Sequence, residues 1–204
     1  VLRGLGSQVD VVVRGDQILR GFDADVRQHL AAEMRLGGIE FHFGRTIKSI
    51  ARADTALRAE LDNGLQLDAD CVLRALGRKP NTTGLGLEAV GITLDAQGAI
   101  PVDRFSQTSV ASIYAVGDVT NRVNLTPMAI REGHAFADTV FGGTARAVDH
   151  ALVPSAVFTT PEAGVVGLTE QQALEQYPRL DVYRSVFRPM KATLSGHPGK
   201  VLLK

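Results

Sequence analysis

Apolar and polar residues follow a strand–helix–strand pattern at the start of the chain. Val9–Arg14 is a β-branched apolar run, which predicts a buried strand. Asp23 predicts the N-cap of a helix over residues 24–36, because apolar residues then recur on one face and Gly37 follows. Ile39–Phe43 predicts a second strand. This order indicates an α/β unit.

From residue 47 onward, apolar and polar residues alternate instead. Ile47–Ala53 and Ala56–Leu61 each predict a strand with one buried face. Asn63 and Gly64 predict a hairpin turn, because both residue types accept positive φ at low cost. Cys71–Leu76 predicts a further strand. The pattern therefore adds an antiparallel meander to the α/β unit.

The rest of the chain is richer in loops. Ile113–Val116 predicts an apolar strand. Thr126 predicts the N-cap of a helix that reaches about Phe141, with Pro127 at its first position. The last quarter combines short apolar runs with a predicted helix over residues 170–177. This quarter is expected to form a further α+β unit.

The composition excludes several classes of protein. The 204 residues carry a formal net charge of +0, with 45% hydrophobic and 22% charged residues, which is ordinary globular composition. A protein that binds nucleic acid or a membrane surface usually shows a basic excess. No apolar run approaches the roughly 20 residues that span a bilayer. The sequence therefore predicts neither a nucleic-acid partner nor a membrane partner.

Cysteine and histidine usage limits the chemistry further. Cys71 is the single cysteine, so the chain can hold neither an internal disulfide nor a redox dithiol. It falls within a predicted apolar strand, where a buried cysteine behaves as a small hydrophobe. A reducing, cytoplasmic setting is the natural inference. No metal site is predicted, because no metal-like spacing is found among His29, His42, His134, His150 and His197.

The two ends of the chain suggest a larger protein. The chain opens at Val1 without a Met or a signal-like region. It closes on Lys200–Lys204, which reads as an unfinished strand. We expect both ends to be cut from inside a longer protein.

Four short segments carry recognisable motifs. They are Val13–Asp23, Ala75–Thr82, Ile113–Thr120 with Leu125–Pro127 shortly after, and Val166–Glu170. In this order they resemble the glutathione reductase branch of the pyridine nucleotide-disulfide oxidoreductases. Each motif alone is weakly specific. Four in family order span essentially the whole chain and make the resemblance strong.

The resemblance implies a fold class and a layout. The fold would be α/β, with partial FAD/NAD(P)-binding Rossmann-like domains, an antiparallel β-meander and the start of an α+β dimerisation domain. Residues 1–77 would be the second half of the NADPH domain and residues 78–150 the returning part of the FAD domain. Residues 151–204 would begin the dimerisation domain. The redox Cys pair and the His-Glu pair of the family would lie outside the chain, so no catalytic residue is expected within it.

The resemblance also implies an activity. The parent protein would be a homodimeric flavoprotein that takes hydride from NADPH to FAD and reduces a small disulfide. Glutathione disulfide is the expected substrate. The cofactors would carry the hard chemistry, while the protein binds and orients them.

Two arginines are the candidates for nicotinamide cofactor selection. Arg14 follows the first predicted strand, where NAD-specific enzymes commonly carry an acidic residue that bonds the ribose 2′-hydroxyl. A guanidinium group there can instead bond a 2′-phosphate bidentately. Arg20 lies on the same loop and can close on the same phosphate. The alternative is a pair of ordinary surface arginines; the family resemblance favours the NADPH interpretation.

Two further pairs of residues are candidates for cofactor contact. Gly77 would let a cofactor approach the backbone, and by resemblance it lies at the nicotinamide cofactor. Arg78 resembles a family arginine near both cofactors, although a salt bridge at a domain junction is an equal alternative. Gly117 clears space beside Asp118, which is placed at the carboxyl end of a predicted strand. By resemblance, the Asp118 carboxylate would bond the ribityl chain of FAD.

The predicted helix from Thr126 is the last candidate element. By resemblance, its amino end is directed at the flavin pyrimidine ring. A helix amino end carries about half a positive charge and would favour the anionic reduced flavin. His134 lies where glutathione reductases often carry an arginine that meets the substrate. It is a candidate substrate residue, with a structural role as the alternative.

Other members of the same family remain open. Dihydrolipoamide dehydrogenases prefer NAD and usually show Ala-His in place of Thr126 and Pro127, so the two arginines and this pair argue against them. A trypanothione or mercuric reductase stays possible. An alternative from another class is a non-catalytic, cofactor-binding fragment, and the isolated chain is expected to be inactive because it has no redox Cys pair.

Overall fold

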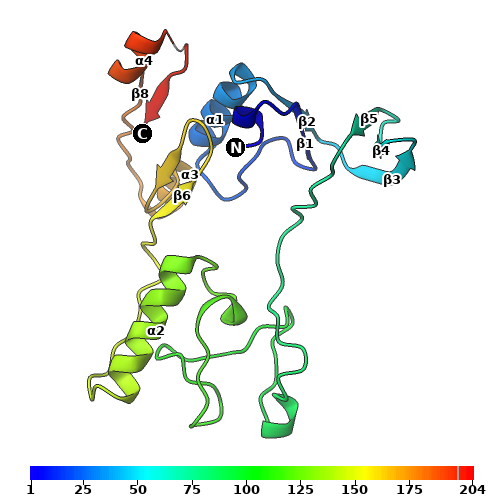
Figure 1. The fold of residues 1–204 in the computed structure, drawn as a ribbon. Helices are drawn as coiled ribbons and strands as arrows, with labels where there is room; N and C mark the ends of the chain where they lie inside the picture. The colour runs from blue at the N-terminus through cyan, green and yellow to red at the C-terminus, as the bar shows by residue number, and fades with distance from the viewer. Residues whose placement is uncertain (197) are drawn as a thin grey trace. The chain divides into compact units, whose positions relative to one another are not determined.

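The computed structural model describes residues 1–196 and 198–204, so His197 lies outside the described residues. The chain divides into two units by internal contacts. The first comprises Val1–Arg74 and Pro154–Lys204, and the second comprises Ala75–Val153 (Figure 1). The three-part division at residues 1–77, 78–150 and 151–204 stays a prediction, because the first unit joins two of these parts.

The predicted strand–helix–strand pattern is confirmed at the start of the first unit. Strand β1 (Val9–Val13) pairs in parallel with β2 (Ile39–Phe43), from Val9 opposite Ile39 to Val13 opposite Phe43. Helix α1 (Ala24–Leu36) connects them. Its N-cap is Asp23, whose carboxylate accepts a hydrogen bond from the Asp25 N–H at 3.0 Å. Because parallel neighbours need a crossover, this is the expected βαβ arrangement.

The predicted meander is also confirmed. Strands β3 (Ile47–Ala53), β4 (Ala56–Leu61) and β5 (Gln66–Ala69) pair antiparallel in sequence order. Gly64 turns the chain between β4 and β5 with a φ of +84°, and the Leu65 N–H donates to the Asn63 side chain at 3.2 Å. The side chains of Ala59 and Leu61 on β4 are buried.

The predicted strand over Cys71–Leu76 is wrong in this structure. Residues 71–80 form no regular secondary structure, and Cys71 is exposed rather than buried. Leu73 and Leu76 are also exposed, at 81% and 83%. An apolar run becomes a strand only where a neighbouring strand supplies backbone partners. No described strand pairs with this segment.

The second unit holds its core between loops rather than in a sheet. Its buried centre is Ile92, Ile100 and Ala115. The predicted strand over Ile113–Val116 is wrong, because the segment makes one isolated bridge, between Gln107 and Tyr114. Apart from the bonds of this bridge, the segment makes a local turn, in which the Ile113 N–H donates to Val110 O at 2.9 Å. Three helices complete the unit: η2 (Glu88–Val90), η3 (Gly117–Thr120) and α2 (Thr126–Val140).

The start of α2 differs from the prediction by one residue. Leu125 occupies the N-cap position, Thr126 is already helical, and no side chain caps the helix. Pro127 lies within the first turn, where its missing N–H is tolerated. The predicted helix is therefore confirmed, while the predicted Thr126 cap is not.

The C-terminal segment of the first unit contains short elements, as the pattern predicted. Strands β6 (Ser155–Val157) and β7 (Ala163–Val165) pair antiparallel, as do β8 (Ser185–Phe187) and β9 (Val201–Leu203). Helix α3 (Glu170–Gln176) starts with a capping box between Thr169 and Gln172. Helices α4 (Met190–Ser195) and, near the N-terminus, η1 (Arg3–Leu5) complete the elements.

A charge cluster joins the start of α1 to this C-terminal segment. The Lys204 ammonium group lies 2.7 Å from Asp23, 2.8 Å from Asp25 and 2.7 Å from Glu170. Arg184 pairs with Asp25 and Glu170.

These contacts shift the pKa values of the cluster. Burial alone would raise the pKa of Asp23, but the hydrogen bonds from Lys204 and from two backbone N–H groups outweigh it, so this pKa is lowered. Hydrogen bonds from Lys204 also lower the pKa values of Asp25 and Glu170. Burial lowers the pKa of Lys204, yet its bonds to the three carboxylates raise it overall.

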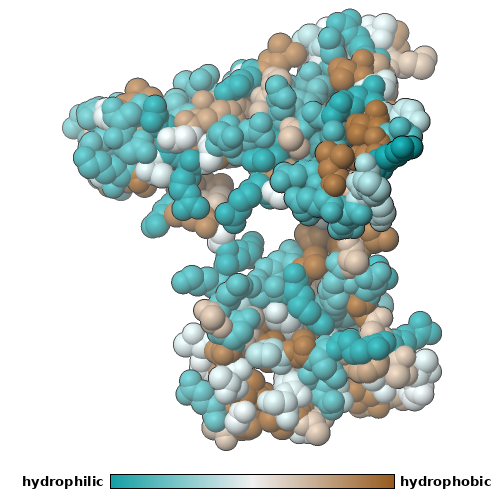
Figure 2. All heavy atoms as spheres, turned by 180° about the vertical axis from the view of Figure 1, so that it is seen from behind, coloured by the Kyte–Doolittle hydropathy of each residue, from teal (hydrophilic) through white to brown (hydrophobic). Residues whose placement is uncertain are grey.

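Apolar side chains reach the surface in both units (Figure 2). Phe158 is 86% exposed in the first unit, and Phe141 is 80% exposed in the second. No described helix has both the length and the apolar character needed to cross a membrane.

Candidate functional site

The loop that carries Arg14 and Arg20 begins at the carboxyl end of β1. Because β1 and β2 are parallel, the residues that follow both strands lie at one edge of the pair. Two backbone bonds join these residues: Gly44 N–H to Gly15 O at 2.9 Å and Arg45 N–H to Val13 O at 3.1 Å. Open α/β sheets bind ligands at this edge.

Both predicted arginines of this loop are exposed. Among the described residues, no carboxylate forms an ion pair with Arg14 or Arg20. Two such guanidinium groups on one loop suit a dianionic group such as a phosphate monoester.

Arg45 is a basic residue at this edge that the sequence interpretation missed. It lies two residues after the end of β2, next to Gly44, and is exposed. The signal was available, because a basic residue after the second parallel strand must lie at the same edge as one after the first.

Gly77 and Arg78 lie at the start of the second unit, apart in the chain from the Arg14–Arg20 loop. Gly77 adopts a φ of +109°, and a Cβ added there would meet no atom within 4 Å. Its backbone conformation, rather than lack of space, is what favours glycine. Arg78 is exposed and forms no ion pair with a described residue.

Gly117 and Asp118 open the short helix η3 rather than ending a strand at a sheet edge. Gly117 is buried with a φ of +73°, and a Cβ added there would lie 3.1 Å from Ala129 Cβ. Glycine is therefore favoured here both by conformation and by packing against α2. The Thr120 hydroxyl donates to Gly117 O at 2.8 Å and closes the turn. The Asp118 side chain is exposed on this closed turn and can accept a hydrogen bond from a sugar hydroxyl.

Glu132 holds this turn from α2, and the sequence interpretation did not identify it. Its side chain is 2% exposed. One carboxylate oxygen accepts the Gly117 N–H at 2.6 Å, and the other lies 3.0 Å from Arg122 and 2.7 Å from His150. Arg122 also donates to Thr120 Oγ1 at 3.2 Å. A charge this deeply buried is stable only when paired and hydrogen bonded, so these contacts are essential to the turn.

The sequence gives a weak signal for Glu132. It lies four residues after Met128, which is 2% exposed, and so shares the buried face of α2. An acidic residue on an otherwise buried face predicts a specific partner. The partner itself, the Gly117 backbone, is visible only in the folded chain.

The amino end of α2 offers fewer free donors than a helix start usually does. The Met128 and Ala129 N–H groups both donate to Leu125 O, at 2.9 and 3.0 Å, and Pro127 has no N–H. Within the first turn of α2, which the structure describes in full, Thr126 is the residue whose N–H donates to no backbone carbonyl. A hydrogen bond from the amino end of α2 to a flavin would therefore depend on the Thr126 N–H group alone.

His134 is exposed on α2 and lines a shallow depression of about 570 Å³. Asp138 and Arg146 line the same depression and pair with each other at 3.0 Å. The structure thus places His134 on an accessible polar surface of the second unit.

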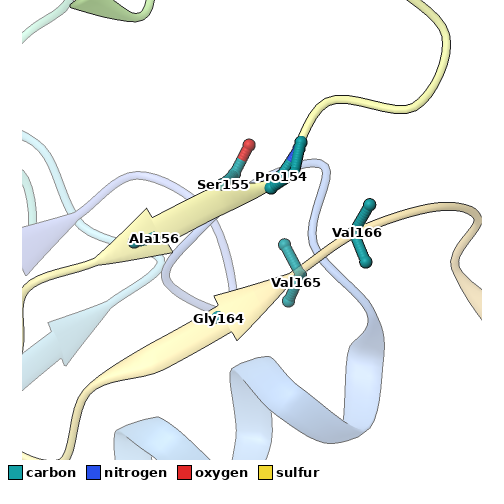
Figure 3. Close-up of a pocket in the computed structure, with 6 residues that line it drawn as sticks. All are labelled: Pro154, Ser155, Ala156, Gly164, Val165 and Val166. Carbon is teal, nitrogen blue, oxygen red and sulfur yellow. The ribbon is translucent and has the colours of Figure 1, made fainter. Parts of the chain in front are cut away.

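Another hollow, of about 390 Å³, lies on the β6–β7 hairpin (Figure 3). The hollow is lined by Pro154, Ser155, Ala156, Gly164, Val165 and Val166. None of these is a predicted site residue, and Ser155 provides the one polar side chain among them. This lining offers no charged or titratable group for cofactor chemistry. Among residues 1–196 and 198–204, no three His, Cys, Asp or Glu side chains form a candidate metal cluster.

Comparison with protein families agrees with the geometry. Residues 1–133 match the pyridine nucleotide-disulphide oxidoreductase family, and residues 153–204 match the dimerisation domain of the same family. The chain belongs to the pyridine nucleotide-disulphide oxidoreductases. The α/β fold class expected from the sequence is thereby confirmed.

Two curated relatives and one solved structure illustrate the similarity. The chain is 52% identical over 204 residues to glutathione reductase of Burkholderia cepacia, covering 100% of this chain and 45% of that protein. It is 48% identical over 205 residues to the chloroplastic/mitochondrial glutathione reductase of Pisum sativum, covering 100% of this chain and 37% of that one. The HOCl-induced flavoprotein disulfide reductase RclA from Escherichia coli superposes with a TM-score of 0.83 at 27% identity, over 98% of this chain and 46% of that one. The chain thus spans less than half the length of these proteins.

The cofactors of this family, FAD and NADPH, are the two that the sequence predicts. The residues present fit them. The Arg14–Arg20 loop provides exposed guanidinium groups without carboxylate partners among the described residues, which suits a 2′-phosphate. The Gly117–Asp118 turn presents a carboxylate on a backbone held by a buried ionic cluster.

Proposed function

We propose that this chain is part of a longer NADPH-dependent FAD flavoprotein that reduces glutathione disulfide. The observation that carries the proposal is the pair of exposed arginines after β1, which form no ion pair with a described carboxylate. An acidic residue is the usual choice at such a position for NAD. The similarity to two glutathione reductases supports the choice of substrate.

Each site residue has a binding or orienting role in this proposal. Arg14 and Arg20 hold the adenosine 2′-phosphate, and Gly77 lets the nicotinamide cofactor approach the backbone. Asp118, kept in place by the Gly117 turn, accepts a hydrogen bond from the ribityl chain of FAD. Two more residues act near the cofactors: the Thr126 N–H is directed at the flavin, and Arg78 lies near both cofactors. When bound, the two cofactors supply the hydride and electron transfer chemistry.

The cysteine pair that carries out thiol–disulfide exchange with the substrate is not among the residues of this chain. Cys71 is its single cysteine, so the 204 residues cannot form the redox Cys pair that the reaction needs. We therefore assign binding roles, and no catalytic role, to the residues of this chain. The 204-residue chain alone is expected to show no turnover.

The cofactor assignment is tested by replacing both Arg14 and Arg20 with Ala in the full-length protein. Each charge-assisted hydrogen bond contributes roughly 1.5–3 kcal/mol, so loss of two should raise the KM for NADPH roughly a hundredfold or more. The KM for NADH should change little. Steady-state kinetics with both cofactors measure this, with Arg52→Ala on β3 as an exposed control. Equal effects on the two cofactors would contradict the proposal.

The substrate, assembly and compartment are parts of the same proposal. His134 departs from the arginine expected at the substrate contact, so activity with glutathione disulfide must be compared with activity toward trypanothione disulfide and lipoamide. Higher kcat/KM for either alternative would reassign the substrate. The match of residues 153–204 to a dimerisation domain supports a homodimer. We further propose a cytoplasmic setting and the three-part division at residues 1–77, 78–150 and 151–204.

A further inference from the structure

Arg27 connects helix α1 to the loop that carries Arg14 and Arg20. Its Nε donates to Ile18 O at 2.6 Å, and its Nη2 donates to Gln17 O at 3.5 Å. One guanidinium group therefore bonds two consecutive carbonyl groups of the loop. Both acceptors lie between the two arginines in the sequence.

The bonded segment has a conformation that needs such support. Leu19, directly after Ile18, adopts a φ of +53°, which is costly for a residue with a branched side chain. Gly21 has a φ of +93°, and the Phe22 N–H donates back to Leu19 O at 3.1 Å. Residues 19–22 therefore form a tight turn immediately around Arg20. A strained turn persists only where its surroundings hold it in place.

Arg27 itself is held firmly. Its N–H donates to Asp23 O at 3.0 Å in the first turn of α1, which the Asp23 side chain caps. At the other end of the loop, Gly15 is bonded to Gly44 after β2. The loop is thus fixed at its start by the β2 edge and near its end by Arg27.

The geometry of the donor explains why this residue is an arginine. The planar guanidinium group presents Nε and Nη2 in a rigid fork that can bond two carbonyl groups at once. A lysine would carry the same charge as a flexible point donor. Among the described residues, no carboxylate pairs with Arg27, and its guanidinium group hydrogen bonds to Ile18 O and Gln17 O of the loop.

We propose that Arg27 is a positioning residue for recognition of the 2′-phosphate. It fixes the backbone between Arg14 and Arg20 and so sets the spacing of their guanidinium groups. This inference rests on the proposed function, because it assumes that those two arginines bind the phosphate. It adds a residue that need not touch the cofactor.

The test is nucleotide binding to the full-length protein, measured by isothermal titration calorimetry. The probes are adenosine 2′,5′-bisphosphate and adenosine 5′-monophosphate, which differ by the 2′-phosphate. Arg27→Gln and Arg27→Lys should each weaken binding of the bisphosphate roughly tenfold, equivalent to about one charge-assisted bond. Binding of the monophosphate should change less than about twofold. The KM for NADPH should rise in parallel while kcat stays unchanged.

Arg35→Gln is the matched control. Arg35 lies on the same helix, and its replacement removes the same charge, but its guanidinium group lies over the rings of Phe41 and Phe43. This variant should keep the wild-type ratio of the two affinities. Loss of the ratio in Arg35→Gln as well would attribute the effect to net charge and overturn the inference.

Three other results would also overturn it. Full affinity for the bisphosphate in Arg27→Lys would mean that the positive charge is sufficient and that the planar guanidinium group is not needed to position the loop. A lower unfolding temperature with an unchanged affinity ratio would assign Arg27 a purely structural role. Equal weakening of both nucleotides would remove the link to the 2′-phosphate. If Arg27→Gln does not fold, the lysine variant decides the question.

Failure of the proposed function would look different. In that case the wild-type protein itself would bind the two nucleotides equally well, and Arg14→Ala would change neither affinity. A wild-type preference for the bisphosphate that is lost in Arg14→Ala but kept in both Arg27 variants would leave the proposed function intact and remove this inference alone.

Discussion

The two candidate cofactor loops are held in place by different means. The Arg14–Arg20 loop is exposed at its charged residues, and its backbone is tied by carbonyl contacts from Arg27 and Gly44. The Gly117–Asp118 turn is held by a carboxylate, Glu132, that is 2% exposed. One loop therefore uses a cation on backbone carbonyls at the surface. The other uses an anion on a backbone N–H in the interior.

This difference predicts how each loop responds to change. Contacts at a partly exposed loop are replaced by water when they are lost, so the loop should shift while the fold persists. A buried carboxylate has no such replacement, and its removal leaves Arg122 and His150 without their partner. Damage to the Arg14–Arg20 loop should appear in cofactor selectivity. Damage to the Gly117–Asp118 turn should appear first in stability.

The largest loss in the free energy of unfolding is expected for Glu132→Ala. Breaking a buried ion pair by removing one partner costs about 3–5 kcal/mol, and the freed Gly117 N–H adds to this. Urea unfolding of the full-length protein measures the loss, and the visible flavin spectrum should show reduced FAD content. Glu132→Gln should be less damaging, because its amide oxygen can still accept the Gly117 N–H.

Glu175→Gln on α3 is the control for that experiment, since Glu175 is exposed. It should leave the free energy of unfolding unchanged. A loss below about 1 kcal/mol for Glu132→Ala would show that the buried cluster does not hold the turn.

A smaller effect is expected for Gly117→Ala. The added Cβ would face a φ of +73° and would lie 3.1 Å from Ala129 Cβ. Gly84→Ala separates these causes, because Gly84 has a φ of +80° with no atom within 4 Å of its added Cβ. We expect about 1 kcal/mol for Gly84→Ala and about 2–3 kcal/mol for Gly117→Ala, measured by thermal unfolding. Equal losses would mean that packing against α2 contributes nothing.

The smallest effect concerns the pH dependence of stability that the charge cluster at the start of α1 provides. The pKa values of Asp23, Asp25 and Glu170 are lowered, so the stability that these carboxylates provide is present above their unfolded values of about 4 and is lost as pH falls further. The raised pKa of Lys204 adds stability that is present below about pH 10.4 and is lost above it.

Lys204→Met should therefore flatten the loss of stability between about pH 5 and pH 3, as followed by urea unfolding in the full-length protein. Lys191→Met on α4 removes an exposed lysine outside the charge cluster and serves as control. An unchanged pH profile in Lys204→Met would show that the cluster does not link the start of α1 to the C-terminal segment.

Local signals in the sequence were sufficient for the elements whose partners lie nearby. The Asp23 cap and the Asn63–Gly64 turn occur as predicted, because caps and hairpin turns depend on a few adjacent residues. The Cys71–Leu76 and Ile113–Val116 runs failed as strands. Their apolar residues favour a strand, but a strand also needs a neighbouring strand to accept and donate its backbone hydrogen bonds, and composition does not supply one.

The sequence by itself determined the family, the strand–helix–strand unit with its meander, and the two arginines placed after β1, since each depends on residue type and spacing along the chain. Only the tertiary structure revealed Arg27 on the loop carbonyls and Glu132 beneath Gly117. Both contacts join residues of different elements, nine to fifteen positions apart in the chain. A carbonyl or an N–H group looks the same in every sequence, so which one a charged side chain bonds is decided by how the elements pack.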